Sequence, residues 1–145
     1  MILADEAATL AVGRALGRVL GAGEVVTLSG PLGAGKTVLA RGVLEGAGHD
    51  GEVASPTFPI VLPYDAPAMR VPVLHADLYR IQQADELDEL GLDDWRHDGA
   101  LVVEWPERGR SWPDALALQL DPEGGARRLT AAVPPGWKDR WPLRP

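Results

Sequence analysis

Residues 29–37 constrain this chain more than any other stretch. They read Ser-Gly-Pro-Leu-Gly-Ala-Gly-Lys-Thr and match G-x-x-x-x-G-K-[ST], the P-loop or Walker A pattern. Glycine at the second, fifth and seventh of these positions allows positive φ and lets the backbone come close to a ligand. The β-rich run 25–28 precedes the pattern and a helical segment follows it, which is the context that a phosphate-binding loop requires.

The motif predicts a role for each of its groups. Gly30, Gly33 and Gly35 allow successive N–H groups to point inward as an anion nest, at the positive end of the following helix. Lys36 adds a positive charge for the β- and γ-phosphates, and the Thr37 hydroxyl is a magnesium ligand. We therefore expect this loop to hold a nucleoside triphosphate with Mg²⁺.

Composition limits what surrounds this loop. The chain has 145 residues, 46% of them hydrophobic, so we expect one globular domain over residues 1–145. Cysteine is absent, which excludes disulfides, thiolate zinc sites and thiol catalysis. The first residues carry acids where a signal peptide carries bases, and no apolar run is long enough to span a bilayer. These features favour a cytoplasmic protein without a membrane partner.

The formal net charge of −7 bears on nucleic-acid binding. A protein that holds RNA or DNA unaided usually presents a basic face, whereas the basic residues here are scattered along the chain. If nucleic acid is involved, we expect a partner to hold most of it.

Hydrophobic periodicity predicts an α/β fold. Helices are expected at 5–20 and 37–47, with short acidic helices at 84–90 and 92–96. Strands are expected at 24–29 and 100–103, and hairpins at 60–64 with 71–75 and at 115–120 with 127–133. The tail 134–145 has no periodic pattern. The predicted fold class is a three-layer α/β P-loop NTPase with a central mixed β-sheet, to which the hairpins add antiparallel strands.

Two acids qualify as partners of the P-loop because each follows an apolar run. Asp77 comes after residues 73–76 and Glu104 after residues 101–103. A carboxylate at the end of a neighbouring strand can hold or polarise the magnesium shell. Glu104 ends the more apolar strand and is the favoured metal ligand. Asp77 is expected either to bind the ion through water or to orient the attacking water.

Three further residues have less specific signals. Ser55 and Thr57 flank a proline, and we weigh a sensor loop near the γ-phosphate against ordinary turn chemistry. His75 is interpreted as a structural residue near a strand end, because the three histidines of the chain lack metal-site spacing.

Five segments, in this order and at these separations, resemble the TsaE (YjeE) family of small bacterial ATPases. They are 33–37 (Gly-Ala-Gly-Lys-Thr), 55–58 (Ser-Pro-Thr-Phe), 75–80 (His-Ala-Asp-Leu-Tyr-Arg), 86–91 (Glu-Leu and Leu-Gly at its two ends) and 103–107 (Val-Glu-Trp-Pro-Glu). The first segment is generic to P-loops, whereas H-x-D-L-Y-R followed by V-E-W-P-E is much more specific. The resemblance covers roughly residues 5–133.

The resemblance implies an ATPase of tRNA threonylcarbamoyladenosine biosynthesis that binds the TsaB–TsaD pair and that turns over slowly, with stimulation by its partners. Its turnover would support repeated modification of tRNA adenosine 37, while the partners hold the tRNA. The resemblance places Gly33, Ala34, Gly35, Lys36, Thr37 and Val38 at the phosphates, Glu6 or Thr9 near the adenine, and Arg128 near the site. It assigns magnesium to Thr37 and Glu104, support of hydrolysis to Asp77, and a switch-like role to the loop with Ser55 and Thr57.

Other functions of a P-loop remain to be weighed. A small-molecule or nucleoside kinase needs an acceptor pocket and usually an arginine-bearing lid, and the segment 80–96 that would supply it is strongly acidic. A GTPase usually has an [NT]-K-x-D loop, but no lysine lies between Lys36 and Lys138. An ABC-type ATPase needs a signature motif and a larger domain. A nucleotide-gated binding module with incidental hydrolysis would share every phosphate-binding residue. The oligomeric state stays open.

Overall fold

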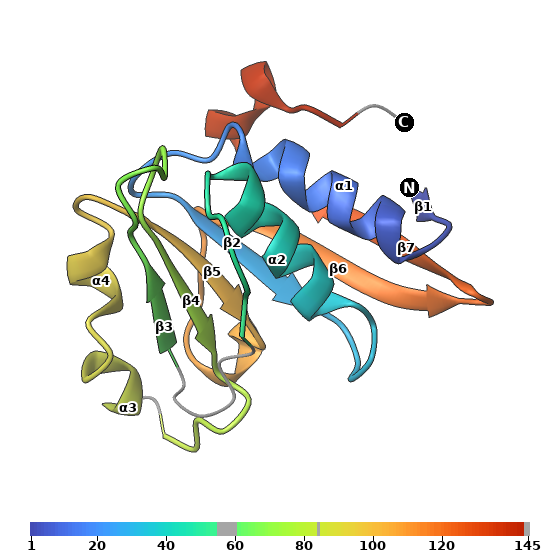
Figure 1. Cartoon of the computed structure of the whole chain (residues 1–145). Coiled ribbons are helices and arrows are strands. Elements are labelled where there is room, and N and C mark those ends of the chain that lie inside the picture. The colour runs from blue at the N-terminus through green and yellow to red at the C-terminus, as the bar shows by residue number, and fades with distance from the viewer. Residues whose placement is uncertain (55–60, 84, 144–145) are drawn as a thin grey trace.

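The computed structural model describes residues 1–54, 61–83 and 85–143. Within them, seven strands form one sheet in the order β1-β7-β6-β2-β5-β4-β3 (Figure 1). The strands are β1 (Ile2–Leu3), β2 (Val25–Ser29), β3 (Val61–Tyr64), β4 (Val73–Asp77), β5 (Ala100–Glu104), β6 (Leu116–Glu123) and β7 (Ala126–Ala132). The pairs β6–β2, β2–β5 and β5–β4 are parallel, and the other three are antiparallel. The predicted mixed sheet with two hairpin additions is confirmed.

The parallel centre of the sheet follows from continuous apolar runs. Every residue of β4 and β5 is buried, as expected for strands that are covered on both faces. The hairpin strands β6 and β7 instead alternate between buried and more exposed residues over much of their length, because helices cover one face more fully than the other.

Helices cover both faces of the sheet and give the predicted three layers. On one face, α1 (Glu6–Gly17) and α2 (Lys36–Gly46) lie side by side (Figure 1). They pack on alternate strand residues such as Val26, Val102 and Leu118. On the other face, the short helices α3 (Asp85–Asp88) and α4 (Leu92–Trp95) pack on the intervening residues, among them Leu74, Leu101 and Val103. The two-residue period of a strand thus separates the two cores.

The contact between α1 and α2 is made through glycines, which the sequence pattern did not reveal. Each helix carries glycines four residues apart, Gly13 and Gly17 on α1 and Gly42 and Gly46 on α2, a spacing that puts both on one helix face. A Cβ at position 13 would lie 2.5 Å from the Leu39 carbonyl oxygen, and one at position 42 would lie 2.5 Å from that of Leu10. The two backbones therefore touch directly.

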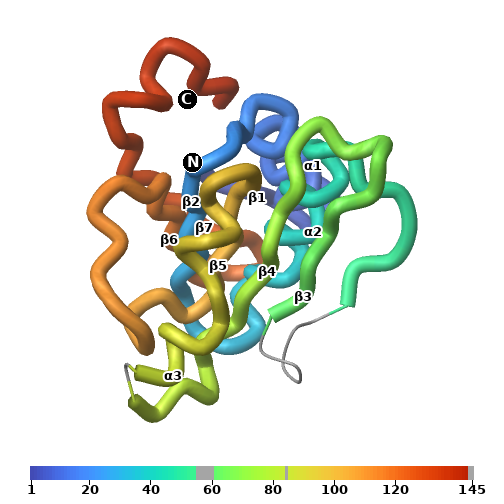
Figure 2. The backbone as a smooth tube through the Cα atoms, turned by 90° about the vertical axis from the view of Figure 1, so that its left-hand side faces the viewer, coloured from blue at the N-terminus to red at the C-terminus, as the bar shows by residue number. Residues whose placement is uncertain are grey.

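The C-terminal tail contains structure where the sequence predicted none. Residues Pro135–Arg140 form a 3-10 helix, and its Trp137 is buried in the same core as α1 and α2. Arg140 bonds the Val19 carbonyl and the Glu24 carboxylate. Figure 2 shows this segment beside the turn that follows α1. The expectation of an irregular tail is corrected for this part, because one buried indole anchors a segment without periodic pattern.

No helix in the described part of the chain is long and apolar enough to cross a membrane.

Candidate nucleotide-binding site

The P-loop joins β2 to α2 as the motif predicts. Its glycines have φ angles of 138° at Gly30, 78° at Gly33 and 99° at Gly35, values that side chains with a Cβ rarely adopt. A Cβ on Gly30 would also collide with the Leu120 carbonyl of β6. Gly35 is the N-cap of α2, so the first N–H groups of the helix lie at the end of the loop.

Lys36 lies inside this loop rather than in solvent. Its side chain is buried, and Nζ donates to the carbonyl of Gly30 and, at 3.4 Å, to that of Pro31. The ammonium also stands 3.7 Å from the centroid of the Trp105 ring, a cation–π contact. Burial lowers the pKa of Lys36, while the nearby charges of Glu104, Glu107 and Asp77 oppose that shift. Thr37, the next residue, is exposed on the first turn of α2.

The two predicted acids meet at one edge of the sheet. Asp77 ends β4 and Glu104 ends β5, and their Cα atoms are register partners in the parallel pair. Glu104 is also the register partner of Leu28, the residue before the end of β2. Both carboxylates are buried, with 8% and 2% of their residues exposed. The carboxyl ends of parallel strands thus bring both acids beside the start of the P-loop.

Each acid has a defined partner. The backbone N–H of Tyr79 donates to Asp77 Oδ1 at 2.9 Å, but burial is the larger influence and raises the pKa of Asp77. Glu104 Oε2 lies 2.6 Å from Nε2 of His75, which is completely buried. The sequence predicts His75 as a structural residue near a strand end, and the structure adds a contact with a residue of the candidate site.

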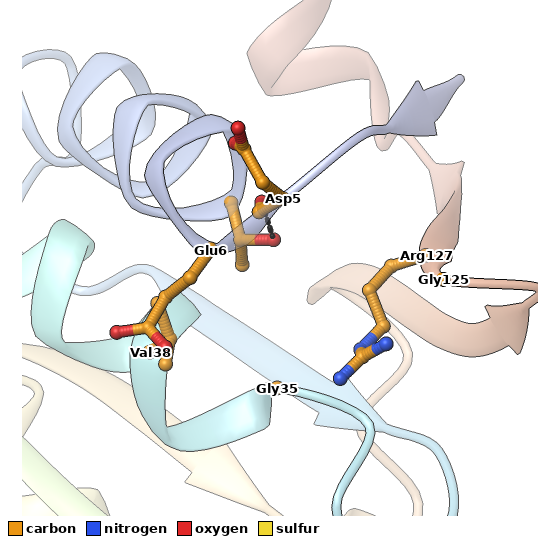
Figure 3. A pocket seen from close by; sticks show the side chains of 7 residues that line it. Asp5, Glu6, Gly35, Val38, Gly125 and Arg127 are labelled. Atoms are coloured by element: carbon orange, nitrogen blue, oxygen red, sulfur yellow. Dashed lines mark hydrogen bonds between the residues drawn. The ribbon is translucent and has the colours of Figure 1, made fainter.

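A pocket beside the P-loop collects residues from three segments (Figure 3). It is lined by Asp5, Glu6, Thr9, Gly35, Val38, Gly125 and Arg127. The two residues expected near the adenine, Glu6 and Thr9, therefore lie next to the loop glycine and to the helix that carries it. The Thr9 hydroxyl donates to the Asp5 carbonyl at 3.3 Å, so the side chain is fixed in the wall of the pocket.

Arg127, rather than Arg128, reaches the P-loop. Its guanidinium donates to the carbonyls of Ala34 at 2.9 Å and Gly33 at 3.3 Å. Arg128 instead pairs with Glu123 of the same hairpin at 2.7 Å and is half exposed. The structure places Arg127 at the loop, and the expected role of Arg128 near the site stays a prediction. The missed signal was strand alternation, because Arg127 shares a face with Leu129 of the core under α1 and α2.

Ser55 and Thr57 lie outside the described residues, so their predicted switch-like role stays a prediction. Among the residues that are described, no group of three or more His, Cys, Asp or Glu side chains is placed to hold a metal ion. The roles of Lys36, Thr37, Asp77 and Glu104 at a nucleotide likewise remain predictions, now with the residues placed around one loop.

Comparisons with known proteins agree with this arrangement. The model of the family described as threonylcarbamoyl adenosine biosynthesis protein TsaE matches residues 3–129. The tRNA threonylcarbamoyladenosine biosynthesis protein TsaE of Streptomyces coelicolor is 40% identical over 135 residues, which are 90% of this chain and 91% of that protein. The protein of the same name from Haemophilus influenzae is 39% identical over 108 residues, 72% of this chain and 67% of its own.

A solved structure resembles the whole fold. The crystal structure of Bacillus subtilis YdiB superposes with a TM-score of 0.73 and 26% identity, over 96% of this chain and 87% of that one. Family model, relatives and fold agree over most of the sequence. The chain therefore belongs to the TsaE family, whose members take part in the biosynthesis of threonylcarbamoyladenosine in tRNA.

Proposed function

We propose that this chain is a magnesium-dependent ATPase that acts on a complex of TsaB and TsaD during tRNA threonylcarbamoyladenosine formation. In this proposal ATP binds in the P-loop and is hydrolysed slowly to ADP and phosphate. The partners hold the tRNA and carry out the transfer, and the hydrolysis cycle energises or resets them. All of this takes place in the cytoplasm.

The observation that carries the ATPase proposal is the meeting of Asp77 and Glu104 at the end of the P-loop strand. Both carboxylates are buried and lie on adjacent parallel strands in register. Their negative charges favour the protonated form of Lys36 and so oppose the lowering of its pKa by burial. Burial of two acids and a lysine around one loop is costly, and a triphosphate with its cation would compensate that charge arrangement. A strand–loop–helix turn that bound no ligand would not require these three buried charged residues.

Magnesium fits the donor set that these residues supply. Mg²⁺ keeps several waters and usually takes one or two protein oxygens together with substrate phosphates. The Thr37 hydroxyl and Glu104 are hard oxygen donors at the loop, and Asp77 stands beside them on the next strand. When bound, the ion would neutralise charge that develops on the phosphates. With a nucleotide bound, Lys36 would supply positive charge to its phosphates.

The partner proposal rests on family membership and on charge. A net charge of −7 disfavours independent binding of tRNA, since phosphate contacts from Lys and Arg dominate such affinity. TsaB and TsaD would then present the tRNA, and the present chain would contact it only through them.

The test is ATP turnover by the purified chain, alone and with TsaB and TsaD. We expect low turnover that the partners stimulate. Lys36→Ala should abolish nucleotide binding or hydrolysis, and Glu104→Ala or Asp77→Ala should reduce kcat by 100-fold or more, an order-of-magnitude expectation for loss of a charged catalytic group, with a smaller effect on affinity. Lys138→Ala, at the chain's other lysine and exposed, is the matched control.

Three outcomes would contradict the proposal. Negligible turnover that the partners leave unchanged would favour a nucleotide-gated binding module. Transfer of the γ-phosphate to a nucleoside or another small molecule would favour a kinase. Equal turnover in the Glu104 variant and the wild type would remove Glu104 from the magnesium site.

A further inference from the structure

His75 and Glu104 form a buried pair that the proposed chemistry does not yet use. The two residues lie on adjacent parallel strands, β4 and β5, and 2.6 Å separates His75 Nε2 from Glu104 Oε2. Their side chains are 0% and 3% exposed. His75, Asp77 and Glu104 share the sheet face that α2 covers. His75 precedes Asp77 by two residues on β4, so its ring lies farther from the carboxyl ends of the strands than the two acids do.

The environment of the ring selects its tautomer. A carboxylate only accepts hydrogen bonds, so Nε2 must carry the proton that joins the pair. The other nitrogen, Nδ1, is buried and has no hydrogen-bond partner among the described residues. An Nδ1–H there would be a buried donor without an acceptor, which is unfavourable.

The pair also restricts Glu104. A glutamate side chain has three rotatable bonds, and its terminal torsion is broad. The bond from Nε2 engages Oε2 and thereby fixes the plane of the carboxylate, which leaves Oε1 to meet a ligand. Groups behind a metal-binding residue orient it in the same way in many metal sites, and their loss typically lowers metal affinity or activity about 10–100-fold.

We propose that His75 is a positioning residue: its Nε2–H holds Glu104 in the orientation that receives the magnesium–nucleotide complex. The inference rests on the proposed function, since it assigns His75 to the same site. It differs from a packing role, in which any residue of similar size would serve. It also predicts that His75 affects binding of the metal-loaded nucleotide and leaves binding of the metal-free nucleotide unchanged.

The first test examines the ring itself. In ¹H–¹⁵N NMR spectra of the nucleotide-free chain, His75 should show a slowly exchanging proton on Nε2 and an unprotonated Nδ1. His75→Gln identifies the signal by its loss. A ring without a proton on Nε2 would overturn the inference, whatever the activity of the chain.

The second test measures ATP affinity by calorimetry, with excess Mg²⁺ and with EDTA. His75→Leu, which removes the donor, should reduce the gain in affinity from Mg²⁺ about 10-fold or more and change the EDTA value less than about 2-fold. His75→Gln places an N–H close to the position of Nε2 and should recover most of the gain. His97→Leu, at an exposed histidine outside the site, is the matched control.

The outcomes separate this inference from the proposed function. A wild-type chain that gains no affinity from Mg²⁺ refutes the magnesium role itself. With a normal wild-type gain, the inference fails if His75→Leu keeps that gain, if it loses affinity equally in EDTA, or if His75→Gln is no better than His75→Leu. If His75→Leu does not fold, the ring tautomer and the Mg²⁺-dependent gain of His75→Gln decide the matter.

Discussion

The two faces of the sheet are covered in opposite ways. On the face of α1 and α2, helices of 12 and 11 residues touch backbone to backbone through two pairs of glycines. On the face of α3 and α4, two helices of 4 residues each rest on the sheet through a few apolar side chains such as Leu87, Leu92 and Trp95. Their remaining residues are largely acidic and exposed.

We relate this difference in helix packing to the position of the candidate site, which lies on the face of α1 and α2. The N-terminus of α2 carries Lys36 and Thr37, and its position relative to β4 and β5 determines whether the P-loop and the two acids meet. A direct backbone contact leaves α2 little freedom to slide or rotate, because packed interiors do not deform continuously. In the part of the chain that the structure describes, α3 and α4 carry no residue of the proposed site and mainly cover the sheet, although Trp105, which contacts Lys36, packs against the same core. We therefore expect substitutions on the two faces to differ in size and in kind.

The largest effect is expected where the helices touch. A Cβ added by Gly42→Ala would meet backbone atoms of α1 at 2.5, 2.9 and 3.1 Å, and no side chain can move aside to relieve the contact. We expect a loss of about 3 kcal/mol in the free energy of unfolding, measured by urea denaturation. The same variant should bind ATP more weakly, because α2 must shift.

Gly136→Ala is the matched control, since a Cβ there meets nothing within 4 Å. It should change stability by less than about 1 kcal/mol. If Gly42→Ala were as stable as this control, the rigid contact between α1 and α2 would not exist as described.

On the opposite face, Leu92→Ala should cost less and leave the site intact. Leu92 is buried on the sheet, and removal of a buried leucine side chain usually costs 2–5 kcal/mol. We expect the lower end, about 2 kcal/mol, because a four-residue helix can settle into the space. ATP affinity should stay within about 2-fold of the wild type. A large loss of ATP affinity in a folded Leu92 variant would show that the two faces are coupled.

A smaller effect is expected at the edge of the P-loop, where Arg127 bonds the Ala34 and Gly33 carbonyls. Arg127→Leu should lower ATP affinity about 5-fold, which corresponds to the roughly 1 kcal/mol of an ordinary hydrogen bond. Arg128→Leu, on the other side of the strand, should lower it less. Calorimetric titration of both variants checks the order, and the reverse order would support the position expected from sequence.

These cases show what the sequence could and could not predict. The P-loop was predictable because its motif is local, and the placement of Asp77 and Glu104 followed from the rule that parallel strands end at one edge. Whether Arg127 or Arg128 faces the P-loop depends on the register of β7. A shift of one residue would exchange the sheet faces of the two side chains. The contact of Gly13 and Gly17 with α2 needed knowledge of which helices pair.

Two further features were hidden for the same reason. The hydrogen bond from His75 to Glu104 joins residues on different strands, so no local pattern contains it. The C-terminal 3-10 helix is held by the buried Trp137 and by the bonds of Arg140 to Val19 and Glu24, and contacts of this kind leave no periodic pattern in the sequence. Local motifs could therefore be predicted from the sequence, whereas contacts between distant segments required the three-dimensional structure.

The smallest effect is expected at the ion pair of Asp93 with Arg110 on the α4 face. Two bonds of 2.6 and 2.9 Å join the side chains, and the bond from Arg110 lowers the pKa of Asp93. A carboxyl with a lowered folded-state pKa contributes stability above its unfolded pKa, and that contribution is lost as the pH falls through the folded value. Because Asp93 is mostly exposed, water screens the pair.

Asp93→Asn should therefore cost less than about 1 kcal/mol at neutral pH. The difference between variant and wild type should shrink as the pH falls below the ordinary aspartate pKa of about 3.9, and it should also shrink in high salt, which screens exposed charges. Urea denaturation at several pH and salt values measures both trends. A difference that persists in acid would mean that Asp93 supports α4 through its shape or its hydrogen bonds to neutral groups. The face of α3 and α4 would then depend on the shape of its side chains, as the face of α1 and α2 does.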